Sequence, residues 1–195
     1  MNLTALVSYL DPIAAILSVF GVMAFVRLKR SGWALEVVAT VLKAVLYYIC
    51  GMYGQVGLKC IFIVMMFYGW YRWKYPNKAG EELKVRSLTR NELVVFALLC
   101  GISMAILGYV LNHYTDSTVP YLDAFITIVA LCTKYMLCNK IIEHWLLGIV
   151  SSIVTFYTHA SVGLPFHAAI HVAYPVIAFL GYRKWRAEMK GNNNP

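Results

Sequence analysis

The chain has 195 residues, of which 61% are hydrophobic and 13% are charged, with a net charge of +8. Soluble domains carry about 25% charged residues, so this chain has too little charge to cover a surface that faces water. Its apolar runs reach the roughly 20 residues that a membrane-spanning helix needs. The composition therefore predicts an integral membrane protein whose surroundings are the lipid bilayer, with no nucleic acid partner.

The first residues, MNLTALVSYLDP, contain no basic segment ahead of the first apolar run, so we expect no removable signal peptide. The five cysteines lie within or at the ends of apolar runs, and none forms a C-x-x-C pair. This placement favours buried thiols over disulfides or metal ligands. We accordingly expect neither a metal nor a cofactor.

Apolar spans follow one another along the chain, at residues 9–28, 33–51, 55–73, 92–111, 121–138, 144–161 and 165–183. We therefore predict an all-α integral membrane protein with seven transmembrane helices in a single transmembrane domain, residues 1–195. One long connection, the polar and turn-rich segment 74–91, separates the third span from the fourth. We expect this linker to be a solvated segment whose basic residues lie near an anionic membrane surface.

The basic residues are distributed unevenly between the two sides of the predicted bundle. One side holds all but three of the 17 lysines and arginines, namely Arg27, Lys29, Arg30, Arg72, Lys74, Lys78, Lys84, Arg86, Arg90, Lys140, Arg183, Lys184, Arg186 and Lys190. Connections on the other side hold none. The positive-inside rule then places the N-terminus outside and the C-terminus in the cytoplasm.

The three remaining basic residues, Lys43, Lys59 and Lys134, lie inside predicted spans. A lysine at a helix centre costs about 2.5–3.5 kcal/mol on insertion scales, and less if its side chain can reach the interface. Lys59 and Lys134 are each about one turn from a span end, whereas Lys43 is near mid-depth. These lysines either extend to the membrane surface or face a polar cavity, and the sequence leaves both alternatives open.

The chain resembles itself at an offset of 112 residues. The matched residues are Asp11 with Asp123, Trp33 with Trp145, Gly51 with Gly163, Gly69 with Gly181, and Trp73 with Trp185. Three helices end on the side opposite to their start, so a second copy in the same orientation needs one extra crossing. We therefore predict 3+1+3 parallel internal repeats: repeat one at about 9–74, a linker and connecting helix at about 75–111, and repeat two at about 121–186. Transporters built from repeats hold their substrate near the midplane, between the repeats.

Aromatic residues are candidates for holding a flat heterocycle, because rings stack and attract cations through their faces. Those within the spans are Tyr47, Tyr48, Trp145, Tyr157 and Tyr174. Another group, Trp33, Trp70, Trp73 and Trp185, lies near the cytoplasmic span ends. For this second group we predict an interfacial aromatic belt.

Four short segments, YGWYRW, YLDAFIT, IIEHW and GYRKW, occur in order at the ends of spans three, five, six and seven. Together they resemble the PnuC family of bacterial vitamin transporters over essentially the whole chain. The resemblance implies a fold similar to the SWEET sugar transporters, a homotrimer in the bacterial inner (plasma) membrane, and facilitated diffusion. It also implies a vitamin or nucleoside substrate, nicotinamide riboside by default, trapped inside the cell by a cytoplasmic kinase.

The chain departs from the family pattern at several positions that approach the substrate site in the family. Lysines replace the usual glutamines at Lys59 and Lys134, and His144, Ser152 and His171 also differ from the usual residues. Glutamine both donates and accepts hydrogen bonds, whereas lysine only donates and carries a charge. The candidate substrate-binding residues are Lys59, Lys134, Trp145, Ser152, Tyr157, His171 and Tyr174.

We therefore predict a facilitator, not an enzyme, that imports nicotinamide riboside or a related vitamin or nucleoside by alternating access. Thiamine, another vitamin or a phosphorylated precursor is the alternative substrate. A membrane enzyme with a metal site at His167 and His171, spaced H-x-x-x-H on one helical face, is the alternative from another class.

Overall fold

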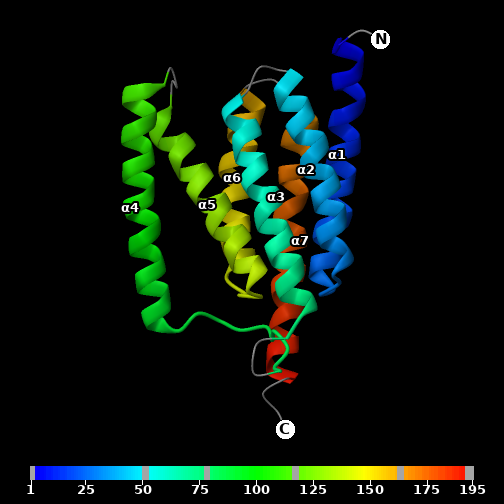
Figure 1. Ribbon diagram of the computed structural model, residues 1–195, viewed down its shortest axis with the longest axis vertical. Helices are drawn as coiled ribbons and strands as arrows, with labels where there is room; N and C mark the ends of the chain where they lie inside the picture. The colour runs from blue at the N-terminus through cyan, green and yellow to red at the C-terminus, as the bar shows by residue number, and fades with distance from the viewer. Residues whose placement is uncertain (1–2, 50–52, 77–79, 116–118, 162–164, 192–195) are drawn as a thin grey trace.

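The computed structural model describes residues 3–49, 53–76, 80–115, 119–161 and 165–191, with side chains left undescribed at 3–8, 53, 155, 157–161 and 165–171. Within these residues the protein is all-helical apart from its connections (Figure 1). The helices are α1 (Leu3–Val26), α2 (Ser31–Ile49), α3 (Tyr53–Lys74), α4 (Arg90–Tyr114), α5 (Pro120–Cys138), α6 (His144–Ser161) and α7 (Pro165–Gly191). The seven predicted spans each correspond to one helix.

The length and hydropathy of the helices suit a membrane. Four helices, α1, α2, α4 and α5, are long and apolar enough to cross a bilayer by length and composition. Helix α3 carries Lys59 and ends in Arg72 and Lys74, and parts of α6 and α7 lie outside the described side chains. Helix α7 continues eight residues past the predicted end of its span, because its last turns still pack: Trp185 is fully buried and Met189 touches the core.

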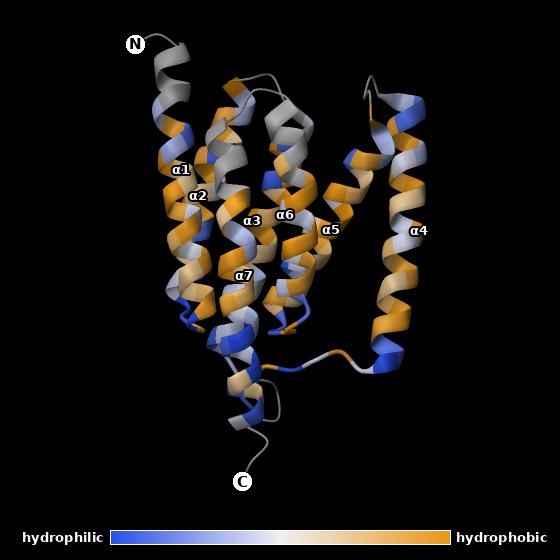
Figure 2. Cartoon of the chain, turned by 180° about the vertical axis from the view of Figure 1, so that it is seen from behind, coloured by the Kyte–Doolittle hydropathy of each residue, from blue (hydrophilic) through white to orange (hydrophobic). Residues whose placement is uncertain are grey.

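Six helices form a closed ring in the order α1, α2, α3, α5, α6 and α7, with α7 returning to α1. Within the described residues, α4 packs against α5 alone and stands apart from the ring (Figure 1). Gly108 permits this contact, because a side-chain carbon there would lie 2.4 Å from the ring of Tyr121. Most of the apolar surface of α4 remains exposed, as expected of a helix surrounded by lipid (Figure 2).

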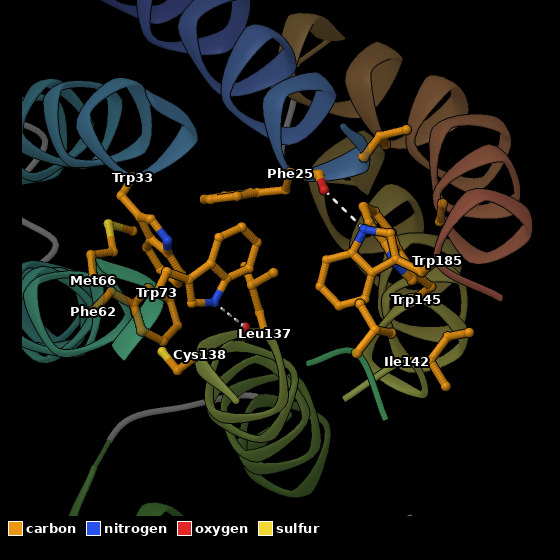
Figure 3. Close-up of a cluster of buried hydrophobic side chains, with 13 residues drawn as sticks. Phe25, Trp33, Phe62, Met66, Trp73, Leu137, Cys138, Ile142, Trp145 and Trp185 are labelled. Atoms are coloured by element: carbon orange, nitrogen blue, oxygen red, sulfur yellow. Dashed lines mark hydrogen bonds between the residues drawn. The ribbon is translucent and has the colours of Figure 1, made fainter. Parts of the chain in front are cut away.

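The core of the bundle is an aromatic cluster at one end of the ring (Figure 3). Trp33 and Trp73 meet edge to face with ring centroids 5.5 Å apart, and Trp145 and Trp185 do the same at 5.6 Å. Trp33, Trp73 and Trp185 are 1%, 7% and 0% exposed. The predicted interfacial belt is therefore wrong for these three residues, because their rings fill the space between the helices.

Two tryptophans of this cluster satisfy backbone groups across the ring. Trp73 Nε1 donates to the carbonyl of Leu137 at 3.2 Å, and Trp185 Nε1 donates to the carbonyl of Phe25 at 2.9 Å (Figure 3). Both carbonyls belong to the last turn of a helix, where the usual i+4 amide donor is missing, and each also accepts the amide three residues later, of Lys140 at 3.1 Å and of Leu28 at 3.0 Å. Each indole bond thus ties the end of one helix to a distant part of the chain.

Helices α1 and α5 end in the same way. Leu28 and Lys140 adopt left-handed backbone conformations, with φ of 54° and 50°. The next amide in each case, of Lys29 and Ile141, donates back to a carbonyl five residues earlier at 2.9 Å. This is the Schellman arrangement that ends many helices, here with a non-glycine residue in the left-handed position.

The linker after α3 lies against the bundle instead of extending into solvent. The amide of Arg86 donates to the carbonyl of Lys140 at 3.1 Å, and the amide of Ile142 donates to the carbonyl of Arg86 at 2.9 Å. Val85 is buried, and the ammonium of Lys140 donates to the Leu83 carbonyl, with burial lowering the pKa of this lysine. The predicted solvated linker is therefore wrong for Val85, which is buried beside the backbone pairing of Arg86, whereas Lys84, Arg86 and Ser87 are exposed.

The cysteines are only partly buried. Among the described residues the free thiols are Cys60, which is exposed, Cys100 and Cys132, which are intermediate, and Cys138, which is buried. Cys50 lies outside the described residues. The expectation of buried thiols therefore fails for Cys60, whose position on the outer face of α3 suits contact with lipid.

Candidate substrate site

A cavity of about 230 Å³ lies inside the ring of six helices. Every helix of the ring contributes to its wall, which consists of Val22, Phe25, Glu36, Phe62, Ala130, Thr133, Lys134, Leu137, His144, Trp145, Gly148, Ser151, Ser152, Tyr174 and Ala178. A concave, mostly apolar pocket with a few polar groups is the usual form of a small-molecule site. The cavity is therefore the candidate substrate site.

Four of the seven predicted site residues line this cavity: Lys134, Trp145, Ser152 and Tyr174. Lys59 does not line it. Its ammonium lies instead over the rings of Phe62 and Tyr47, 5.2 Å and 5.4 Å from their centroids, and Phe62 forms part of the wall. The side chains of Tyr157 and His171 are outside the described part of the structure.

Two hydroxyls of the wall are already used as donors. Thr133 Oγ1 donates to the carbonyl of Val129 at 2.8 Å, and Ser152 Oγ donates to the carbonyl of Gly148 at 2.7 Å. This back-bonding to the residue one turn earlier is common for hydroxyls within helices. Each oxygen keeps lone pairs, so both residues offer acceptors to a ligand.

His144 offers another acceptor. Its Nδ1 lies 2.7 Å from the carbonyl of Ile141, which can only accept, so Nδ1 carries the proton and donates. In this neutral tautomer Nε2 has a lone pair. That atom is buried, and no partner for it occurs among the described residues. The ring is fixed in place between Trp145 and Trp185, with centroids 4.3 Å and 4.6 Å away.

Trp145 adds a hydrogen-bond donor to the cavity wall, and Glu36 adds a carboxylate. Trp145 Nε1 and Glu36 Oε1 are both buried, and within the described part of the chain neither has a hydrogen-bond partner. Glu36 packs against Gly21, where a side-chain carbon would lie 2.8 Å from its Cγ. Buried polar atoms are nearly always satisfied, so these three atoms, all on the cavity wall, are available to a bound molecule.

Sequence reasoning left Glu36 and His144 out of the site, although both stand out in the sequence. Glu36 is a carboxylate inside an apolar span, which marks a functional position by default. His144 occupies a position where the chain departs from the family pattern. Both residues lie near the ends of their predicted spans, 33–51 and 144–161, whereas the substrate site was expected near the midplane.

A ring of apolar helices around a cavity lined by polar and aromatic groups is the architecture of a multi-pass helical membrane protein with a small-molecule site. The chain belongs to the nicotinamide mononucleotide transporter family, whose sequence profile matches residues 8–187. Membership of a transporter family favours transport over the enzyme alternative at His167 and His171, whose side chains lie outside the described residues.

Individual relatives agree with this assignment. The nicotinamide riboside transporter PnuC of Neisseria mucosa is 25% identical over 198 residues, which cover 94% of this chain and 74% of the relative. The crystal structure of the vitamin B3 transporter PnuC superposes with a TM-score of 0.79 at 22% identity, covering 94% of this chain and 83% of that one. The second comparison establishes the fold.

Proposed function

We propose that the protein is a facilitator that imports nicotinamide riboside, or a closely related vitamin nucleoside, by alternating access. The observation that carries this proposal is the cavity with three unpartnered polar atoms, Glu36 Oε1, His144 Nε2 and Trp145 Nε1. A nucleoside with a flat heterocycle supplies hydroxyls and an amide for these atoms, and aromatic walls suit its ring. The name of the Neisseria mucosa relative supports the same substrate.

We propose that Lys134, Trp145, Ser152 and Tyr174 contact this substrate directly. Lys59 influences the site through Phe62, whose ring it contacts. Tyr157 and His171 remain candidates from the sequence. Isothermal titration of the purified protein with nicotinamide riboside, its mononucleotide, thiamine and riboflavin tests the proposal. Binding of nicotinamide riboside that weakens in Trp145→Phe is the expected result. Binding of thiamine or riboflavin alone would replace the substrate, and absence of binding to all four would overturn the proposal.

We also propose that the chain consists of two parallel repeats, 9–74 and 121–186, joined by the linker and α4. Matched contacts support this arrangement. Trp73 of the first repeat donates to Leu137 of the second, and Trp185 of the second donates to Phe25 of the first. Trp185 lies 112 positions after Trp73, and Leu137 lies 112 positions after Phe25. The left-handed residues Leu28 and Lys140 are also 112 positions apart. Substitutions at matched positions should therefore have matched effects on stability.

The proposed orientation has the N-terminus outside and the C-terminus in the cytoplasm, which the charge distribution supports. Fusions of a reporter that is active only outside the cytoplasm test it. Such a reporter should be inactive at the C-terminus and active at the N-terminus. The reverse pattern would overturn the orientation.

The resemblance to the PnuC family supports two further proposals, a homotrimer and a cytoplasmic kinase that traps the substrate by phosphorylation. Light scattering of the purified protein should give three copies of the chain per particle. Uptake of labelled substrate into vesicles without a kinase should stop once the inside and outside concentrations are equal. Accumulation above that level would contradict facilitated diffusion.

A further inference from the structure

An ion pair joins the two helices of the cavity wall that flank α3. Glu36 on α2 and Lys134 on α5 approach to 3.8 Å between Oε2 and Nζ, with side chains only 11% and 15% exposed. This distance is too long for a hydrogen bond, so the two groups attract each other without satisfying each other. Glu36 Oε1 is free, and the ammonium of Lys134 has no hydrogen bond within the described residues. Both groups therefore retain bonding capacity that faces the cavity.

The interior of the ring also holds more positive than negative charge. Lys43 donates to Ser18 at 2.7 Å and interacts electrostatically with Glu36 and Asp11. Lys59 and Lys134 lie over the same Phe62 ring, 5.2 Å and 5.9 Å from its centroid. Among these described residues, three lysines thus share two carboxylates. A lysine without a carboxylate partner is costly to keep charged in this environment, and a ligand that brings a negative charge to Lys134 would offset that cost.

We propose that this site selects a substrate carrying a carboxylate, which binds Lys134, while its cationic or hydroxyl-bearing part faces Glu36. The substrate class is a zwitterionic nucleoside such as a pyridinium carboxylate riboside, in preference to the corresponding carboxamide. This inference rests on the proposed function and makes its substrate more specific. It assigns Lys134 and Glu36 as the residues that determine specificity.

The number of donors in the cavity distinguishes a carboxylate from a phosphate. Lys134 is the one basic side chain among the described residues of the wall, and His144 presents a lone pair. A phosphate monoester carries about −1.5 to −2 charges and three strong acceptor oxygens, which exceed what one ammonium can satisfy. A carboxylate carries one charge and matches a single ammonium, with Trp145 Nε1 left to donate to another oxygen of the ligand.

The test compares ligands that differ at one group. Purified wild-type protein is titrated calorimetrically with nicotinic acid riboside, nicotinamide riboside and nicotinamide mononucleotide. The acid riboside should bind about tenfold or more tightly than the amide, and more tightly than the mononucleotide. Lys134→Gln should lower the affinity for the acid by about tenfold or more and leave the amide within about threefold, since only the acid loses a charged partner.

Matched variants separate recognition from stability. Lys134→Arg keeps the charge and should retain the preference, and Lys184→Gln, at an exposed position of α7, should change neither affinity. Because Lys134→Gln leaves Glu36 unpaired, the double variant Glu36→Gln/Lys134→Gln restores a neutral pair and should show the same loss of preference. Using the ratio of two affinities makes the result independent of the folded fraction.

The possible outcomes separate this inference from the function on which it rests. Equal or tighter binding of the amide by wild type, or an unchanged ratio in Lys134→Gln, overturns the inference and leaves nicotinamide riboside import standing. Tightest binding of the mononucleotide replaces the carboxylate by a phosphate and overturns it as well. Failure to bind any of the three overturns the proposed function, and the inference with it.

Discussion

We compare segments 9–74 and 121–186, called here the first and second halves. They share a set of tryptophan–glycine packing contacts but contribute different side chains to the cavity wall. In each half a tryptophan at the start of the middle helix lies against a glycine of the last helix, Trp33 on Gly69 and Trp145 on Gly181. The wall, however, takes four side chains from the first half, of which Glu36 alone is polar. The second half supplies the remaining polar groups.

Matched positions show where the halves differ. Position by position at the offset of 112, Val22 corresponds to Lys134, Gly32 to His144, and Glu36 to Gly148. The positions that hold the same residue in both halves pack the helices together. The neighbouring positions that differ between the halves carry the charged and hydrogen-bonding groups. If the two halves are repeats, as we propose, one of them supplies most of the polar groups of the cavity while both supply the tryptophan–glycine contacts.

The largest effect is expected from adding a side chain at the two glycines that contact tryptophan rings, Gly69 and Gly181. A side-chain carbon at Gly69 would lie 2.3 Å from the Trp33 ring, and one at Gly181 would lie 2.6 Å from the Trp145 ring. Gly69→Ala and Gly181→Ala should each lower the free energy of unfolding by about 1–3 kcal/mol, because a rigid indole cannot move aside. Unfolding in detergent measures this. Gly101→Ala, with nothing within 4 Å, should be neutral or stabilising.

Removing the two indole hydrogen bonds tests whether the halves are energetically equivalent. Trp73→Phe and Trp185→Phe should each lower the free energy of unfolding by about 0.5–1.5 kcal/mol, since each removes one hydrogen bond to a carbonyl that keeps a backbone amide donor. The two costs should agree closely. A cost confined to one variant would contradict the proposed repeats.

The matched pair Trp33 and Trp145 should differ in its effect on substrate binding. Trp145→Phe removes a donor that faces the cavity, whereas Trp33 lies outside the cavity wall. Trp145→Phe should weaken binding of the nucleoside by about three- to tenfold, which corresponds to one ordinary hydrogen bond. Trp33→Phe should leave the dissociation constant unchanged. Equal weakening by both variants would show that the effect is structural.

The smallest expected effect concerns a contact that only the second half makes. Glu143 accepts from the amide of Leu88 at 3.2 Å and from the hydroxyl of Ser87, which fastens the linker to the bundle. Glu143→Gln should cost about 1 kcal/mol or less, because the backbone pairing of Arg86 remains. Proteolysis of the linker should become faster. The exposed Glu188→Gln serves as the control.

The helices and the matched tryptophan positions were predictable from the sequence because apolar length and paired tryptophans are local signals. The burial of Trp33, Trp73 and Trp185 was not, because an aromatic residue near a span end has the same local pattern whether it faces lipid or a neighbouring helix. Only the closure of the ring decides between these environments.

Of the four predicted residues that line the cavity, Lys134 stands out because a lysine is unusual inside a span, and Trp145 because it matches Trp33 at the offset of 112. The roles of Glu36 and Lys134 were not predictable, because they lie 98 positions apart and become partners only when α2 and α5 face the same cavity. The linker contact was equally hidden, since it depends on the backbone of Arg86 and Lys140 and not on side-chain type.

The exchanged tryptophan bonds set an order for biogenesis. When the first half has entered the membrane, the Trp73 indole lacks its acceptor and the Phe25 carbonyl has only the amide of Leu28 as a donor, because Leu137 and Trp185 are encoded far downstream. The bond between Trp185 and Phe25 joins residues 160 positions apart, so the ring cannot close until the last helix is inserted. A chain truncated before α7 would lack the helix that closes the ring between α6 and α1. Quality control of membrane proteins would then have a direct signal that synthesis is incomplete.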